Sequence, residues 1–160
     1  MSDAKDVRSI LVHAGRAEAR RDGSRTIEAE HVLLALAGMQ DSSAARMLAA
    51  AGLTEDAIRA ALDSEWEQSL AVAGIAVRTG GLPPASPEPG RDPQIGESTK
   101  LVLRRGTDAA PKGARFGPMR ILVGLLDSDR GRVARALQAA GVDRTALHAE
   151  AAEALAKGTH

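Results

Sequence analysis

Apolar residues along the chain gather in two stretches that have almost no polar face. The first stretch is TIEAEHVLLAL at residues 26–36, and the second is RFGPMRILVGL at residues 115–125. A small-residue segment ending in glycine follows each one, AARMLAAAG at 44–52 and VARALQAAG at 133–141, and six of these nine aligned positions are identical. Both pairs are related by one offset of 89 residues. The pattern therefore predicts an internal duplication.

Helical spacing of the apolar residues predicts four helices in the first copy. We expect these helices over residues 2 or 3 to 21, 29–37, 43–51 and 55–70. Asp22-Gly23, Gly38 and Gly52 are stop signals, and Thr54 is an N-cap for the fourth helix. The second helix has almost no polar face, so we expect it at the buried centre of the repeat.

The second copy repeats this plan and gives eight helices in total. We expect its helices over residues 97–110, from Pro118 to 126, from Asp129 or nearby to Gly141, and from a cap at Asp143 to about 156. Five of the seven prolines fall between residues 74 and 93, where they exclude helix. We thus expect one all-α domain over 1–160, with repeat one at 3–73, a linker at 74–95 and repeat two at 96–156.

The composition supports closely packed helices and restricts the chemistry. Hydrophobic residues make up 44% of the chain, and Trp66 and Phe116 are the only aromatic residues. The chain has no cysteine, so it can form neither a disulfide nor a thiolate metal site. No basic segment followed by an apolar run opens the sequence, and no window of 18 apolar residues occurs, so we expect a cytoplasmic protein without a membrane contact.

The net charge is zero, but the two halves differ. Residues 1–73 hold 8 basic and 12 acidic side chains, whereas residues 74–160 hold 13 and 9. This asymmetry either steers an acidic partner to the second half, or helps the halves pack together, or reflects an ordinary solvated surface.

No constellation in the sequence supports catalysis. A phosphate-binding G-x-x-x-x-G-K-[ST] loop is absent, and no serine lies in a nucleophile motif. His31 has no second histidine one helical turn later, which favours packing or hydrogen bonding over metal binding. We therefore expect a protein that is not an enzyme and has no cofactor and no metal.

The segment from Ile27 through Glu30, His31 and the apolar run to Leu36 resembles the Clp N-terminal repeat. That repeat occurs twice at the amino end of the Clp unfoldases, with the motif Ile-Gly-Thr-Glu-His-[Ile/Val/Leu]-Leu-Leu-[Gly/Ala]-Leu, and Glu28 and Ala29 replace its Gly-Thr here. The resemblance implies an eight-helix module of two four-helix repeats with pseudo-twofold symmetry. It also implies a free-standing binding module without the motor, which engages unfoldase components, adaptors or substrate peptides.

In some members of that family the module recognises phosphoarginine through the Glu of each Glu-His pair and a Thr early in each first helix. The resemblance carries only Glu30 over, since Met119 and Arg120 replace the second Glu-His, and the aligned Thr positions fall near Lys5 and Ile95. At most half of a phosphoarginine site is implied. An acid in the first turn of a helix is also favoured by the helix dipole alone, which is the structural interpretation of Glu30.

The difference between the repeats predicts two unlike sites. We expect a guanidinium or another cation to prefer the side of Glu30 and His31. An acidic or apolar peptide should prefer the side of Met119 and Arg120, where an apolar and cationic surface replaces the acidic one.

A different class of function is nucleic-acid binding by the second repeat. Its basic side chains are Arg104, Arg105, Lys112, Arg115, Arg120, Arg130, Arg132 and Arg135. Such a cluster can bind phosphates. No recognition helix stands out, however, and the total charge is neutral, so we take this function as the alternative to protein and peptide binding.

Overall fold

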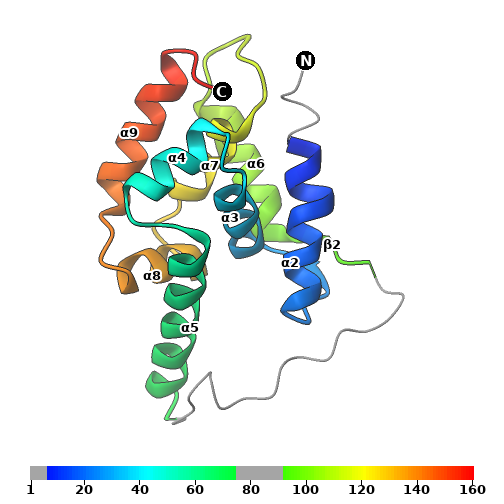
Figure 1. Cartoon of the computed structure of the whole chain (residues 1–160), viewed down its shortest axis with the longest axis vertical. Coiled ribbons are helices and arrows are strands. Elements are labelled where there is room, and N and C mark those ends of the chain that lie inside the picture. The colour runs from blue at the N-terminus through cyan, green and yellow to red at the C-terminus, as the bar shows by residue number, and fades with distance from the viewer. Residues whose placement is uncertain (1–6, 75–91) are drawn as a thin grey trace.

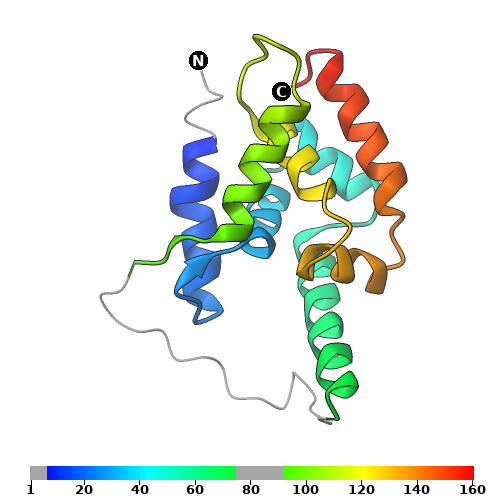
Figure 2. The same ribbon diagram turned by 180° about the vertical axis from the view of Figure 1, so that it is seen from behind.

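The structure is a computed structural model, which describes residues 7–74 and 92–160. In these residues the chain forms eight helices and one short pair of strands (Figures 1 and 2). The first helix combines a π-helical segment η1 (Ser9–Ala14) with α2 (Gly15–Arg21), and its expected start at residue 2 or 3 lies outside the described residues. The predicted all-α fold is confirmed.

The other helices follow the predicted pattern. They are α3 (Ala29–Gly38), α4 (Ser43–Ala50), α5 (Glu55–Val72), α6 (Glu97–Ala109), α7 (Pro118–Leu126), α8 (Arg132–Ala139) and α9 (Arg144–Ala156). The helices α7, α8 and α9 each begin 89 residues after α3, α4 and α5, so the offset of the duplication appears in the structure as well. Most predicted ends agree within two residues.

Local capping signals explain these boundaries. The side chains of Ser42, Thr54 and Asp143 each accept a hydrogen bond from the backbone N–H three residues later, which satisfies a donor that the first helical turn leaves free. The start of α8 was expected at Asp129 or nearby. This helix begins at Arg132 and not at Asp129, because Gly131 precedes it with a φ of 99°, a conformation that favours glycine.

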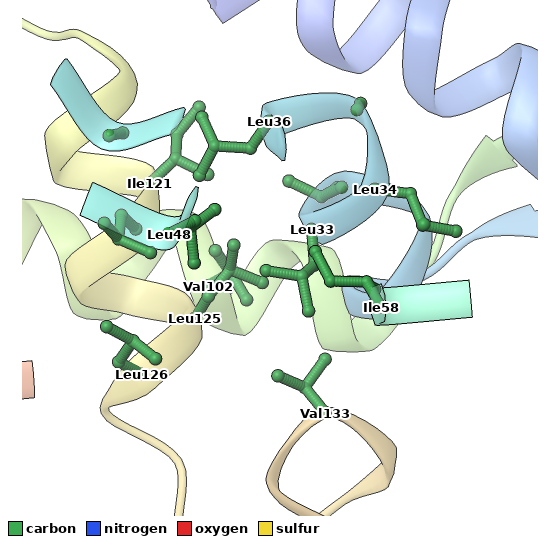
Figure 3. Close-up of a cluster of buried hydrophobic side chains, with 14 of the residues drawn as sticks. Leu33, Leu34, Leu36, Leu48, Ile58, Val102, Ile121, Leu125, Leu126 and Val133 are labelled. Carbon is green, nitrogen blue, oxygen red and sulfur yellow. The ribbon is translucent and has the colours of Figure 1, made fainter. Parts of the chain in front are cut away.

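The helices α3 and α7 form the centre of the molecule, as their lack of a polar face predicts. Residues 31–36 of α3 and all of α7 are buried. Figure 3 shows how leucines of α3 and α7 meet side chains from α4, α5, α6 and α8, among them Leu48, Ile58 and Val133. The two repeats therefore share one hydrophobic core.

A pair of two-residue strands was not predicted. The strand β1 (Thr26–Ile27) pairs in parallel with β2 (Gln94–Ile95), with Thr26 opposite Gln94. The strand β2 falls inside the linker expected at 74–95, of which residues 75–91 lie outside the described part. Each strand leads directly into a helix, so the pairing joins the start of α3, the second helix of repeat one, to the start of α6, the first helix of repeat two.

Candidate functional site

The predicted site residue Glu30 lies in a pocket that both repeats build. Its volume is about 230 Å³, and it is bordered by α2, α3, α5 and the start of α8. The lining residues are Glu18, Arg21, Asp22, Glu30, His31, Leu34, Arg59, Leu62, Asp63 and Arg132. Acidic side chains outnumber basic ones there by four to three, so the pocket has a small negative charge.

Glu30 belongs to the first turn of α3, and its side chain is 13% exposed. The helix dipole alone does not account for its carboxylate, which also has a side-chain partner. It accepts a hydrogen bond from Nη1 of Arg132 over 3.3 Å, and Arg132 comes from the other repeat. The negative charge that sequence analysis assigned to this side is thus present, but a guanidinium already contacts it.

His31 is buried with 2% exposure, and both of its ring nitrogens have partners. Nδ1 accepts a hydrogen bond from the backbone N–H of Glu28 over 2.9 Å, while Nε2 lies 3.1 Å from Oδ2 of Asp22. Since Nδ1 accepts, the geometry fits the tautomer whose Nε2–H donates to Asp22. His31 therefore orients Asp22, an acid of the pocket.

Asp22 closes this chain of hydrogen bonds at the mouth of the pocket. The hydrogen bond from His31 lowers the pKa of Asp22 below its ordinary value, and the charge of Arg132 adds to this effect against the opposing effect of burial. Its side chain is half exposed, and Nη1 of Arg132 lies 3.9 Å from its Oδ2. Asp22 is thus a second carboxylate that a cation in the pocket can reach.

Glu65 also binds Arg132. This residue is 3% exposed, and its two oxygens accept hydrogen bonds from Nε of Arg132 over 3.2 Å and from Nε of Arg135 over 2.8 Å. Ser69 donates a third over 2.9 Å. Burial alone would raise the pKa of Glu65, but these hydrogen bonds and charges hold it below its ordinary value.

Arg59 neutralises another acid of the pocket. Its two terminal nitrogens donate to both oxygens of Glu18 over 2.8 and 2.7 Å, a bidentate pair that raises the pKa of Arg59. Glu18 is consequently less available to a ligand than Glu30 and Asp22.

The second predicted site is not at a surface. Met119 is fully buried, and Arg120 is only 8% exposed. The guanidinium of Arg120 donates to the carbonyl of Ala114 over 2.7 Å and lies 4.9 Å from the ring centre of Phe116. The expectation of an apolar and cationic surface at this position was therefore wrong, because α7 is the central helix of its repeat and turns all of its side chains into the core.

Half of the basic cluster of repeat two is also engaged inside the molecule. Arg132 and Arg135 pair with Glu65, Arg120 binds a carbonyl, and Arg105 lies 3.7 Å from Asp127. The pairing of α8 arginines with acids of repeat one shows that the unequal charges of the halves help to pack them together. The other four, Arg104, Lys112, Arg115 and Arg130, are exposed, so internal pairing leaves half of the cluster for contacts with phosphates.

Arg132, Asp22 and Glu65 were not predicted as members of the site. Arg132 and Glu30 are 102 residues apart, and no local spacing connects them. The opposite net charges of the two halves were the one sign in the sequence that they interact, and these totals do not identify the residues that pair.

In the part of the chain that the structure describes, no cluster of three or more His, Asp or Glu side chains is arranged to hold a metal ion. No helix in that part is long and apolar enough to cross a bilayer.

The profile of the Clp repeat N-terminal domain matches residues 5–112, which is more than half of the chain. The matched range includes Glu30 and His31 and ends before the altered second copy of the motif at 115–125.

Proposed function

The chain belongs to the Clp repeat N-terminal domain family, and from that membership we propose that it is a protein- and peptide-binding module of a Clp protease system. It acts there as an adaptor, a regulator or a partner that sequesters ligands. Domains of this family bind substrates, are not catalytic, and interact in general with Clp components and substrates.

The pocket at Glu30 is the observation that supports this proposal most directly. It combines two carboxylates that a ligand can reach, Glu30 and Asp22, with the apolar side chains of Leu34 and Leu62. A carboxylate binds a guanidinium by charge-assisted hydrogen bonds, and apolar walls accommodate the methylene stem of a long cationic side chain. The ligand class that this arrangement fits is an arginine side chain of a bound protein, phosphorylated or not.

A pull-down from lysate of the source cells tests the proposed function. We expect the wild-type chain to recover a Clp unfoldase, its adaptors or its substrates, identified by mass spectrometry. Glu30→Gln should recover less of the substrate proteins, because it removes the charge that binds the cation. The control Glu150→Gln changes an exposed acid of α9 far along the chain from the pocket and should behave as wild type.

Two outcomes would contradict the proposal. Recovery of no Clp component and no substrate would remove the function itself. Equal recovery by wild type and Glu30→Gln would leave the function but place the binding surface outside the pocket.

Nucleic-acid binding remains the alternative, and a gel shift at low salt tests it. We expect no shift, since internal contacts hold Arg120, Arg132 and Arg135 and leave only part of the cluster to neutralise phosphates. A salt-sensitive shift would favour the alternative.

A further inference from the structure

The pocket at Glu30 already contains a guanidinium, and it belongs to the protein itself. Arg132 is the first residue of α8 in repeat two, yet its side chain reaches across to repeat one. It lies between Glu30, at 3.3 Å, and Glu65, at 3.2 Å, and Asp22 is 3.9 Å away. Arg132 thus places in the pocket the same chemical group, a guanidinium, that the pocket is suited to bind.

The charges of the pocket depend on this one side chain. Four acids and three arginines line the pocket, so its formal charge is −1 with Arg132 and −2 without it. Glu18 is paired with Arg59, whereas Glu30 is contacted by Arg132, so Arg132 is the guanidinium that neutralises Glu30.

Arg132 can leave Glu30 without stranding a buried charge. Glu65, its other partner, keeps the hydrogen bonds from Arg135 and Ser69 when Arg132 moves away. The side chain of Arg132 is 28% exposed and lies 5.9 Å from the ring centre of Trp66, which is itself 42% exposed. Solvent and an aromatic face are therefore within reach of the displaced guanidinium.

We propose that Arg132 is an internal occupant of the Glu30 pocket, which a cationic side chain of the ligand must displace. This inference rests on the proposed function and adds its regulation. The contact weakens binding of any single cation and favours ligands that gain further contacts around the pocket, because part of their binding free energy is used to expel Arg132.

The chain offers a matched pair of variants for the test. Arg132 and Arg135 both lie on α8 and both donate to Glu65, but only Arg132 reaches Glu30. The probe is N-acetyl-arginine amide, titrated calorimetrically into the full chain. Arg132→Ala should bind it about two- to fivefold more tightly than wild type, the range expected for removal of one partly exposed competing ion pair. Arg135→Ala should bind it as wild type does.

The double variant Glu30→Gln with Arg132→Ala shows whether the gain acts through the proposed carboxylate. It should lose the added affinity. Circular dichroism establishes that each variant is folded, and Arg132→Gln, which keeps most of the side-chain stem, replaces Arg132→Ala if the latter is not.

The contrary outcomes separate this inference from the proposed function. Equal affinity of wild type and Arg132→Ala overturns the displacement and leaves the pocket as a cation site. Weaker binding by Arg132→Ala overturns it as well, since Arg132 would then contact the ligand. Absence of binding to every variant overturns both the displacement and the cation pocket.

Discussion

Glu28 connects the two repeats through a single side chain. It is the N-cap of α3, and its carboxylate accepts hydrogen bonds from Thr26 over 2.7 Å and from the hydroxyl and backbone N–H of Ser98 at the start of α6. The carboxylate also covers Gly96, where a Cβ would overlap it. Burial would raise the pKa of Glu28, but these hydrogen bonds keep it below its ordinary value.

Replacement of Glu28 by alanine should therefore destabilise the fold. We expect Glu28→Ala to lower the free energy of unfolding by about 1–3 kcal/mol, since it removes an N-cap and leaves donors of the second repeat without an acceptor. Glu150→Ala, on the exposed face of α9, should change it by less than about 0.5 kcal/mol. Urea denaturation followed by circular dichroism measures both. Equal values for the two variants would contradict the bridging role of Glu28.

The buried carboxylate of Glu65 predicts a loss of stability in acid. Its pKa is lowered in the folded protein, so it stabilises the fold above its ordinary pKa of 4.5, and this contribution is lost as the pH falls through the folded-state value. Asp22 and Glu28 act in the same direction. The free energy of unfolding should fall between about pH 6 and pH 3.

Two variants, Glu65→Gln and the control Glu150→Gln, show how much of this loss of stability in acid is due to Glu65. Glu65→Gln should be less stable than wild type at pH 7, because Arg132 and Arg135 lose a buried counter-charge, and its stability should depend less on pH. Glu150→Gln should keep the wild-type slope. A slope that Glu65→Gln leaves unchanged would show that other carboxylates are responsible.

At the scale of elements, α6 and α7 approach each other closely, and glycines at the contact permit it. A Cβ at Gly124 would overlap the carbonyl oxygen of Val102, and a Cβ at Gly106 would overlap that of Arg120. The two helices thus approach backbone to backbone, as the small-residue composition of the chain favours.

The variant Gly124→Ala distinguishes the effect of this close packing on stability from the effect of helix propensity, because the two have opposite signs. Propensity alone would make Gly124→Ala more stable by about 1 kcal/mol. Overlap with Val102 should instead destabilise the protein by about 1–3 kcal/mol. A thermal unfolding midpoint above that of wild type would contradict the close crossing.

The elements themselves could be predicted because their signals are local. Thr54, Asp143 and Gly52 mark helix ends within a few residues of sequence, and the apolar run at 31–36 identifies the central helix. The strand pair could not, since two residues carry no periodicity and their partners are 68 residues apart. His31 was correctly favoured as a hydrogen-bonding residue, but its partner Glu28 is not a usual N-cap, so the link between them gave no recognisable signal.

For the molecule as a whole, the two copies of the duplication differ in structure at the position of Glu30. The helices of the two repeats keep the same offset. In repeat one, Glu30 and Asp22 line a pocket, whereas Met119 and Arg120, which replace the Glu-His pair in repeat two, are buried. The buried state of Arg120 could not be seen in the sequence, because an arginine in a helix ordinarily faces water. The two repeats therefore divide their roles: repeat one supplies the carboxylates, and repeat two supplies the arginine that contacts them.

This division makes the Glu30 pocket the central claim, and an NMR titration tests it most directly. Phosphoarginine and N-acetyl-arginine amide, each added to the ¹⁵N-labelled chain, should shift the backbone amides of Asp22, Glu30, Leu34 and Arg132, and Glu30→Gln should lose most of these shifts. Amides around Met119 should stay unchanged, because that position is buried. Shifts that persist in Glu30→Gln, or that are confined to repeat two, would contradict the account.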